Sequence, residues 1–237
     1  MDSALRPPPD FQVYLIGDRR LLAPRDLAQV CSAVLGALAR DPSAVRVALQ
    51  LREKDLDGRD LYRLATALRP ICTRHGAPLI VNDRIDIALA SGADGVHLPS
   101  DSFAIADARR LLGPSRLIGV STHTAAEAAD AAAAGADFAV FGPVWPSLSK
   151  PGYGPARGAE GLGAACRAAP GLALYALGGV TAERVASLGA CAGGTAAALG
   201  GGRPAGVAVI GAVFGADDPV AAALALARAV RGALAPH

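Results

Sequence analysis

Polar side chains suited to binding phosphate follow several short apolar segments of this sequence. Gln50, Arg52 and Lys54 alternate after one such segment, so they share a face if the chain is extended there. Two cations on one face can bind a polyanion, although an ion pair with Glu53 or Asp83 would also satisfy them. The pattern therefore predicts either a polyanion site or a buried ion-pair network.

Residue types that are rare in this chain also follow such segments. The sequence has two lysines, one asparagine and one tryptophan against 21 arginines. These rare residues are Lys54, Lys150, Asn82 and Trp145. We interpret a scarce residue type that is kept at such places as one that the chemistry requires. Trp145 either covers the site or packs on the surface.

A second group of residues suits a phosphate monoester. Ser147, Ser149 and Lys150 lie in a proline-flanked loop, where hydroxyls and one ammonium can hold phosphate oxygens, although an ordinary surface loop is the alternative. Glycine lets backbone amides approach an anion at Gly178–Gly179 and at Ile210–Gly211. We therefore expect two anion sites, one built on cations and one built mainly on backbone amides.

One carboxylate and two histidines complete the candidate site. Asp83 is the best candidate ligand for a hard cation such as Mg²⁺, which takes one or two carboxylates plus substrate phosphates, and a helix N-cap is the alternative. We interpret His97 as a structural histidine at a strand end. His123 directly follows a predicted strand and can titrate near neutral pH, so it is a candidate acid or base.

The elements that must position these residues alternate between short apolar runs and alanine- and leucine-rich segments. The runs are typical of strands buried on both faces, and the segments between them have helical periodicity. Eight such units predict a single (β/α)8 TIM barrel, with a doubly wound open sheet as the alternative. The active site of a barrel lies at the carboxyl ends of its strands. The predicted strands are Phe11–Ile16, Val45–Leu51, Pro78–Val81, Gly95–Leu98, Arg116–Val120, Phe138–Phe141, Leu172–Leu177 and Gly206–Ile210.

The segment Gly-Ala-Asp precedes two of these strands, at residues 92–94 and 135–137. A glycine that closes a helix in the left-handed conformation, followed by a short turn into a strand, explains the recurrence.

Composition narrows the class of protein. The chain has 237 residues and a net charge of +2, which is too weak to indicate a nucleic-acid or membrane-surface partner. No uncharged apolar run reaches the ~18–20 residues of a membrane span, and no secretory signal is evident. The four cysteines are scattered without a CxxC pair, as in reducing compartments. We expect one cytoplasmic domain over residues 1–237, with an extended or disordered segment over about residues 1–10. The sequence leaves open whether the chain forms a homodimer.

Five ordered motifs resemble the thiamine phosphate synthase family. They are Gln50-Leu51-Arg52-Glu53-Lys54, Val81-Asn82-Asp83-Arg84, Gly119-Val120-Ser121-Thr122-His123-Thr124, Phe141-Gly142-Pro143-Val144 and Ala176-Leu177-Gly178-Gly179-Val180. The resemblance implies a TIM barrel that joins hydroxymethylpyrimidine diphosphate to a (carboxy)hydroxyethylthiazole phosphate in thiamine biosynthesis. Pyrophosphate is released in that reaction.

The resemblance also implies a role for each matching residue. The leaving diphosphate would be held by Arg52, Lys54, Asn82 and Lys150, and Asp83 would bind the cofactor Mg²⁺. Gln50 and Ser121 would face the pyrimidine. The thiazole phosphate would be held by Ser147, Ser149, Gly179, Ile210 and Gly211. The implied order of events is loss of the diphosphate, then attack of the thiazole nitrogen on a pyrimidine carbocation.

One segment departs from the family pattern. The family usually has His-Leu-Gly-Gln-Asp-Asp after the fourth strand, and its last aspartate is a second metal ligand. Here Ser102 holds that place in His97-Leu98-Pro99-Ser100-Asp101-Ser102, and the sequence does not decide whether Asp101 replaces the missing ligand.

The same segment resembles the related thiazole tautomerases, in which a histidine matching His123 would be the acid or base. Such a tautomerase, and a non-catalytic barrel that binds thiamine precursors, are the alternatives. The retained diphosphate-binding residues favour the synthase.

Overall fold

Eight parallel strands close into a barrel, in which each strand pairs with its neighbours in sequence and β1 pairs with β8. The computed structural model describes residues 9–42, 45–146, 155–185 and 202–234. The closed barrel confirms the predicted (β/α)8 TIM barrel, and the open sheet was the wrong alternative. All eight predicted strands form, with ends displaced by at most two residues. They are β1 (Val13–Gly17), β2 (Val47–Leu51), β3 (Leu79–Asn82), β4 (Gly95–Leu98), β5 (Leu117–Thr122), β6 (Phe138–Phe141), β7 (Ala173–Leu177) and β8 (Gly206–Val209).

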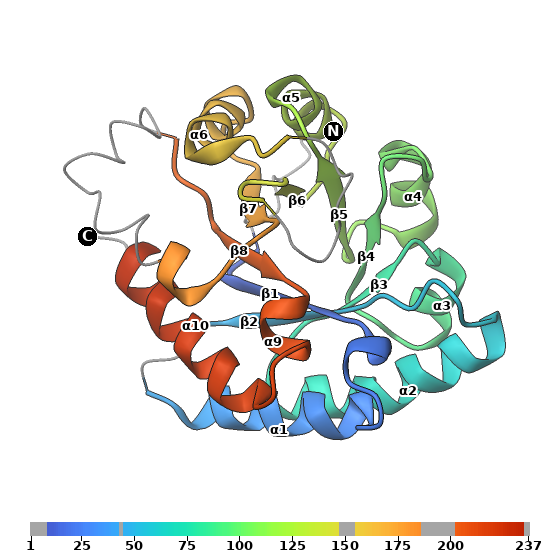
Figure 1. Cartoon of the computed structure of the whole chain (residues 1–237). Coiled ribbons are helices and arrows are strands. Elements are labelled where there is room, and N and C mark those ends of the chain that lie inside the picture. Colours follow the sequence, from blue (N-terminus) through green and yellow to red (C-terminus); the bar gives the residue numbers. More distant parts are fainter. Residues whose placement is uncertain (1–8, 43–44, 147–154, 186–201, 235–237) are drawn as a thin grey trace.

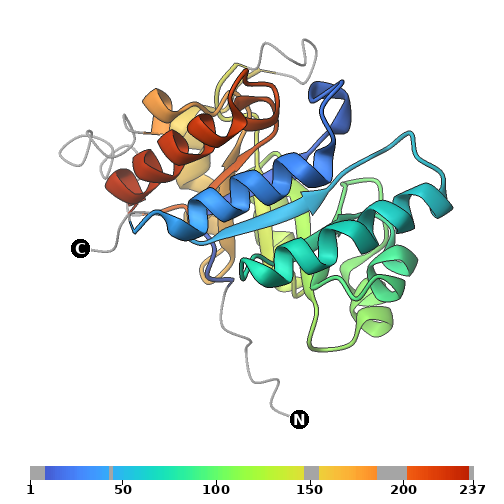
Figure 2. The ribbon, with the colours of Figure 1, turned by 90° about the horizontal axis from the view of Figure 1, so that it is seen from below.

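Helices surround the strands (Figure 1). They include α1 (Leu27–Arg40), α2 (Gly58–Arg74), α3 (Ile85–Ala90), α4 (Ile105–Leu112), α5 (Ala125–Ala133), α6 (Gly158–Ala168), α9 (Gly211–Phe214), α10 (Pro219–Leu234) and the 3-10 helix η1 (Arg19–Leu21). Helix α1 packs between α10 and α2, as Figure 2 shows. It begins where the Asp26 carboxylate accepts the Gln29 amide at 2.8 Å, which satisfies one of the unpaired amides of the first turn.

The interior of the barrel changes character along its axis. Phe11, Tyr14, Phe138 and Tyr175 pack together in the amino-terminal half, with ring centroids between 4.8 and 6.3 Å apart. A Cβ atom at Gly119 would lie 2.2 Å from the Phe138 ring, so only glycine leaves room for that ring. Toward the carboxyl ends, polar side chains replace the aromatic ones, and a binding site can form there.

A repeated ion pair fastens the amino ends of the strands. Asp94 accepts hydrogen bonds from Arg69 of α2 at 2.6 Å and from the first amide of β3 at 2.7 Å. Asp137 accepts in the same way from Arg109 of α4 at 2.6 Å and from an amide of β5 at 2.7 Å. Each carboxylate therefore joins a helix to the strand that follows it, and satisfies a strand-end amide that the sheet leaves unpaired.

Two expectations concern the chain's ends and membranes. The predicted extended segment over residues 1–10 lies almost wholly outside the described residues, which begin at residue 9. Within the described ranges, no helix is both long and apolar enough to cross a bilayer.

Candidate active site

The carboxyl end of β2 carries the first part of the candidate site. Ala48 packs inside the barrel, and alternation along the strand gives Gln50 and Arg52 the same inward face. Gln50 is buried and donates a hydrogen bond to the Tyr14 hydroxyl at 2.8 Å. Lys54 lies exposed in the turn beyond the strand, so the alternation that orients Gln50 and Arg52 does not extend to it.

The two cations after β2 form no direct ion pair with a described carboxylate, although the Arg52 charge helps Arg20 to lower the pKa of Asp18. Neither Arg52 nor Lys54 forms an ion pair with any residue that the structure describes. Buried Glu53 instead accepts the Arg19 amide at 2.7 Å and lies 3.6 Å from the Arg19 guanidinium, and burial raises the pKa of this carboxyl. Within the described residues, Arg52 and Lys54 therefore form no ion-pair network with Glu53 or Asp83, and the polyanion site stays a prediction.

The carboxyl ends of β3 and β4 bring Asp83 and Ser102 together. Asp83 has a φ of 64°, in the left-handed region, and its amide donates to the His97 carbonyl at 2.9 Å. The Ser102 hydroxyl donates to the Asp83 carboxylate, whereas Asp101 is exposed. The N-cap position of α3 falls on Arg84 and has no side-chain cap, so Asp83 does not serve as the helix cap that was the alternative.

The donors around Asp83 suit a magnesium ion that takes part of its ligands from the substrate. Carboxylate oxygen is a preferred ligand of Mg²⁺, which commonly binds one or two carboxylates and completes its shell with phosphate and water. Across the described ranges, no group of three or more histidine, cysteine, aspartate or glutamate side chains could hold a metal. Asp83, with Ser102 beside it, therefore offers a partial ligand set that a diphosphate would complete.

His97 and Ser121 form a hydrogen-bonded pair on the inner face of the barrel. The His97 Nε2 atom lies 3.0 Å from the Ser121 hydroxyl oxygen. Burial, with the Arg52 cation nearby, lowers the pKa of His97 to about 3, so this imidazole is neutral. Among the described residues, its Nδ1 atom has no hydrogen-bond partner.

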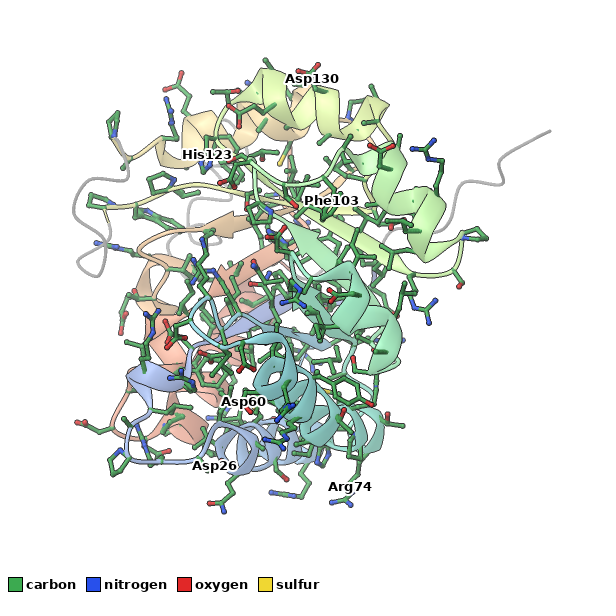
Figure 3. The ribbon with its side chains drawn as sticks, turned by 90° about the vertical axis from the view of Figure 1, so that its right-hand side faces the viewer. Asp26, Asp60, Arg74, Phe103, His123 and Asp130 are labelled. Carbon is green, nitrogen blue, oxygen red and sulfur yellow. The ribbon has the colours of Figure 1, made fainter. Side chains whose placement is uncertain are left out.

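His123 follows β5 at the rim of the barrel (Figure 3). Its Nδ1 atom lies 2.6 Å from the Gly142 carbonyl oxygen after β6, and its amide donates to the Glu127 carboxylate at 2.7 Å. A carbonyl only accepts, so Nδ1 carries a proton in this contact.

The glycines after β7 adopt a conformation that few other residues could take. Gly178 and Gly179 have φ values of 95° and 61°, and a Cβ atom at Gly179 would lie 2.5 Å from the Pro146 carbonyl oxygen. The Trp145 amide donates to the Gly178 carbonyl at 3.1 Å, and Arg184 donates to the Gly179 carbonyl. The Trp145 contact joins the segment after β7 to the one after β6, whose residues Ser147, Ser149 and Lys150 lie outside the described residues.

Ile210 and Gly211 lie directly after β8. Ile210 is half-buried against the apolar cluster inside the barrel, and Gly211 begins the short helix α9. A Cβ atom at Gly211 would meet no atom within 4 Å. Packing therefore does not require glycine there, and the open space beside it leaves room for a ligand.

Four residues around the site escaped prediction from the sequence. Tyr14 bonds Gln50, Arg19 bonds Glu53, and Arg184 bonds the Gly179 carbonyl; Ser102, noted only as a departure from the family, bonds Asp83. Three of these contacts join different strands or loops, and residue spacing along one strand carries no signal for them. The Arg184 contact is local, five residues along the same segment.

A hollow of about 600 Å³ opens at the opposite, amino-terminal end, lined in part by Arg69, Asp94 and Arg116. Arg69 and Asp94 already pair with each other, and Arg116 donates to the Ala93 carbonyl at 3.3 Å. Because these charged groups are already paired, the hollow is a poor ligand site.

The sequence and structure resemble known proteins over most of their length. Residues 13–200 match the model of the family described as thiamine monophosphate synthase. The chain is 40% identical to a thiamine-phosphate synthase of Roseiflexus sp. (strain RS-1), over 94% of this chain and 86% of that protein. It is 45% identical to a thiamine-phosphate synthase of Methanoculleus marisnigri, over 75% of this chain and 79% of that protein.

Solved structures give the same likeness. A thiamine phosphate pyrophosphorylase from Pyrococcus furiosus superimposes with a TM-score of 0.74 at 28% identity, covering 95% of this chain and 98% of that one. A 3-hexulose-6-phosphate synthase, at 20% identity and a TM-score of 0.59, shares the fold alone.

Proposed function

The chain belongs to the thiamine monophosphate synthase family and is a transferase of the thiamine-phosphate synthase type, and we propose that it joins hydroxymethylpyrimidine diphosphate to a (carboxy)hydroxyethylthiazole phosphate at the carboxyl ends of its strands. The observation that carries this site is the inward-facing, half-buried Arg52, which has no ion-pair partner among the described residues. A half-buried cation without a direct ion pair in the described part of the chain is available to bind a ligand that supplies negative charge.

The diphosphate end of the pyrimidine substrate is the proposed ligand of these cations. Arg52, Lys54 and Lys150 would hold it together with the Asn82 amide. Negative charge grows on the diphosphate as its bond to the pyrimidine methylene carbon breaks, so these groups bind the transition state more tightly than the ground state. One well-placed donor in such a role contributes about 3–4 kcal/mol.

The two heterocycles are proposed to meet in the centre of the barrel, at the carboxyl ends of its strands. Gln50 and Ser121 would face the pyrimidine. The phosphate of the thiazole would lie against Ser147, Ser149, Gly179, Ile210 and Gly211. Anchoring both partners by their phosphates orients the thiazole nitrogen toward the electron-poor methylene carbon, which replaces a random encounter with a held geometry.

We propose Mg²⁺ as the cofactor, with Asp83 as its protein ligand. When bound, the ion would neutralise charge on the leaving diphosphate. The Ser102 hydroxyl beside this carboxylate would fix its orientation, since it donates to one of its oxygens. The exposed Asp101 is no part of this proposal.

The reaction is tested by incubating the purified protein with both phosphorylated precursors, with and without Mg²⁺. We expect thiamine phosphate and pyrophosphate in equal amounts, formed only when the metal is present. Product without metal would overturn the role of Asp83, and no product at all would overturn the proposed reaction.

A thiazole tautomerase is the second candidate, and one observation favours it. The Ser102 hydroxyl, and no second carboxylate, lies beside Asp83 among the described residues. His123 lies at the rim of the barrel, where its Nδ1 atom donates a hydrogen bond to the Gly142 carbonyl. Isomerisation of the carboxythiazole phosphate that is lost in His123→Ala, without any coupling to the pyrimidine, would support this reading. Arg52 and Lys54, which form no ion pair with a described residue, favour the synthase instead.

We further propose that the enzyme works in the cytoplasm as one domain over residues 1–237. A homodimer is the assembly that we would test first, by light scattering of the purified protein.

A further inference from the structure

His97 lies on β4 and Ser121 on the adjacent strand β5. Both are inside the barrel, beside the proposed pyrimidine site. His97 is 3% exposed, and its ring contacts the Tyr14 and Phe138 rings at centroid distances of 5.8 and 6.0 Å. Its Nε2 atom bonds the Ser121 hydroxyl oxygen, and its Nδ1 atom has no partner in the part of the chain that the structure describes. This arrangement limits where the ring proton can be.

The neutral imidazole carries one proton, on Nε2 or on Nδ1. With the proton on Nδ1, a buried N–H would have no acceptor among the aromatic rings. With the proton on Nε2, the unpartnered atom is an acceptor, and buried acceptors without partners are tolerated better than buried N–H groups. The Nε2–H form therefore prevails, and His97 donates to the Ser121 oxygen.

A serine oxygen that accepts from His97 must direct its own proton elsewhere. Ser121 has no other hydrogen-bond partner among the described residues, and it is half-buried near the carboxyl end of β5. We propose that His97 is a positioning residue that makes Ser121 a hydrogen-bond donor to a ring nitrogen of the pyrimidine. Gln50, on β2, would face the same ring. This inference rests on the proposed function, because it names the group on the substrate that the site reads.

The tautomer is tested first, on the substrate-free protein. Proton–nitrogen correlation spectra of imidazole-labelled protein distinguish a protonated from a bare ring nitrogen. We expect the His97 Nε2 to be protonated and Nδ1 to be bare, and the assignment rests on loss of these signals in His97→Gln. A protonated Nδ1 would overturn the inference whatever the enzyme does.

Binding of hydroxymethylpyrimidine diphosphate then tests the coupling of the two residues. We expect His97→Leu and Ser121→Ala each to weaken binding about tenfold, and the double variant to be no weaker than either one. His97→Gln places an amide N–H near the same position and should bind within about threefold of the wild type, which a merely structural role would not predict.

Two outcomes separate failure of this inference from failure of the proposed function. Losses that multiply in the double variant, with a wild type that binds and turns over, overturn only the inference. A wild type that does not bind the diphosphate overturns the proposed function as well. If His97→Leu fails to fold, His97→Gln and Ser121→Ala still decide the matter, since Gln must then retain binding that Ala loses.

Discussion

Two pairs of cations at opposite ends of the barrel differ in whether they bind carboxylates. At the amino ends, Arg69 and Arg109 each bind a carboxylate that also accepts a strand amide. At the carboxyl ends, Arg52 and Lys54 have no carboxylate partner within the described ranges. Arg69 and Arg109 thus hold elements together, as Arg19 and Glu53 do at the carboxyl ends, whereas Arg52 and Lys54 are available for a ligand. Stability and binding are therefore separable by mutation.

Arg52→Ala should have the largest effect, and on activity alone. Removing one preorganised donor to the leaving diphosphate should lower kcat by about 100- to 1,000-fold. Urea unfolding should shift by less than about 0.5 kcal/mol, because Arg52 forms no ion pair with a described residue. The control is Arg63→Ala, on the exposed side of α2, which should change neither quantity. A fall in stability that matches the fall in activity would assign Arg52 to the scaffold.

Asp137→Asn should have the reverse effect. The variant loses the charge that holds Arg109 and an amide of β5, so the free energy of unfolding should fall by about 2 kcal/mol. The melting temperature should fall by about 4–8 °C, while kcat/KM at 25 °C stays unchanged. Exposed Asp130, on the nearby helix α5, gives the matched control Asp130→Asn, which should leave the melting temperature unchanged. Equal melting temperatures for the two variants would show that the Arg109–Asp137 ion pair does not stabilise the protein.

Glu53→Gln gives the smallest effect, and it depends on pH. Burial raises the pKa of Glu53, so between its ordinary and its raised pKa the folded protein binds more protons than the unfolded chain. Glu53 therefore costs the wild type stability as pH rises through this window, and it costs nothing once the group is protonated in both states. Glutamine keeps the acceptor for the Arg19 amide and does not titrate. Chemical denaturation gives the free energy of unfolding of both proteins at pH 4 and pH 7. Relative to the wild type, the variant should be more stable at pH 7 than it is at pH 4. A constant difference between the two proteins would contradict this.

Much of the scaffold could be predicted because its signals are local. Apolar runs marked all eight strands, and alternation placed Gln50 on the inner face of β2. The glycines of the two Gly-Ala-Asp segments have positive φ values of 66° at Gly92 and 86° at Gly135, as the predicted helix ends require. The sequence predicts no role for the aspartates of the same segments, because each forms an ion pair with an arginine more than 20 residues away.

The site was less predictable for the same reason. The sequence favours a structural role for His97, because its contact with Ser121 depends on which strands become neighbours in the closed barrel. The choice between Asp101 and Ser102 depends on how the loop after β4 turns, and the structure brings Ser102 to Asp83. Spacing along one strand fixes the face of a residue, but its partner is chosen by the packing of several strands.

A crystal structure of the protein with bound pyrophosphate tests the contrast between the two ends most directly. We expect density for the anion at the carboxyl ends of the strands, within hydrogen-bond distance of the Arg52 guanidinium. Density in the amino-terminal hollow beside Arg69 and Arg116, with Arg52 turned away from any anion, would contradict it.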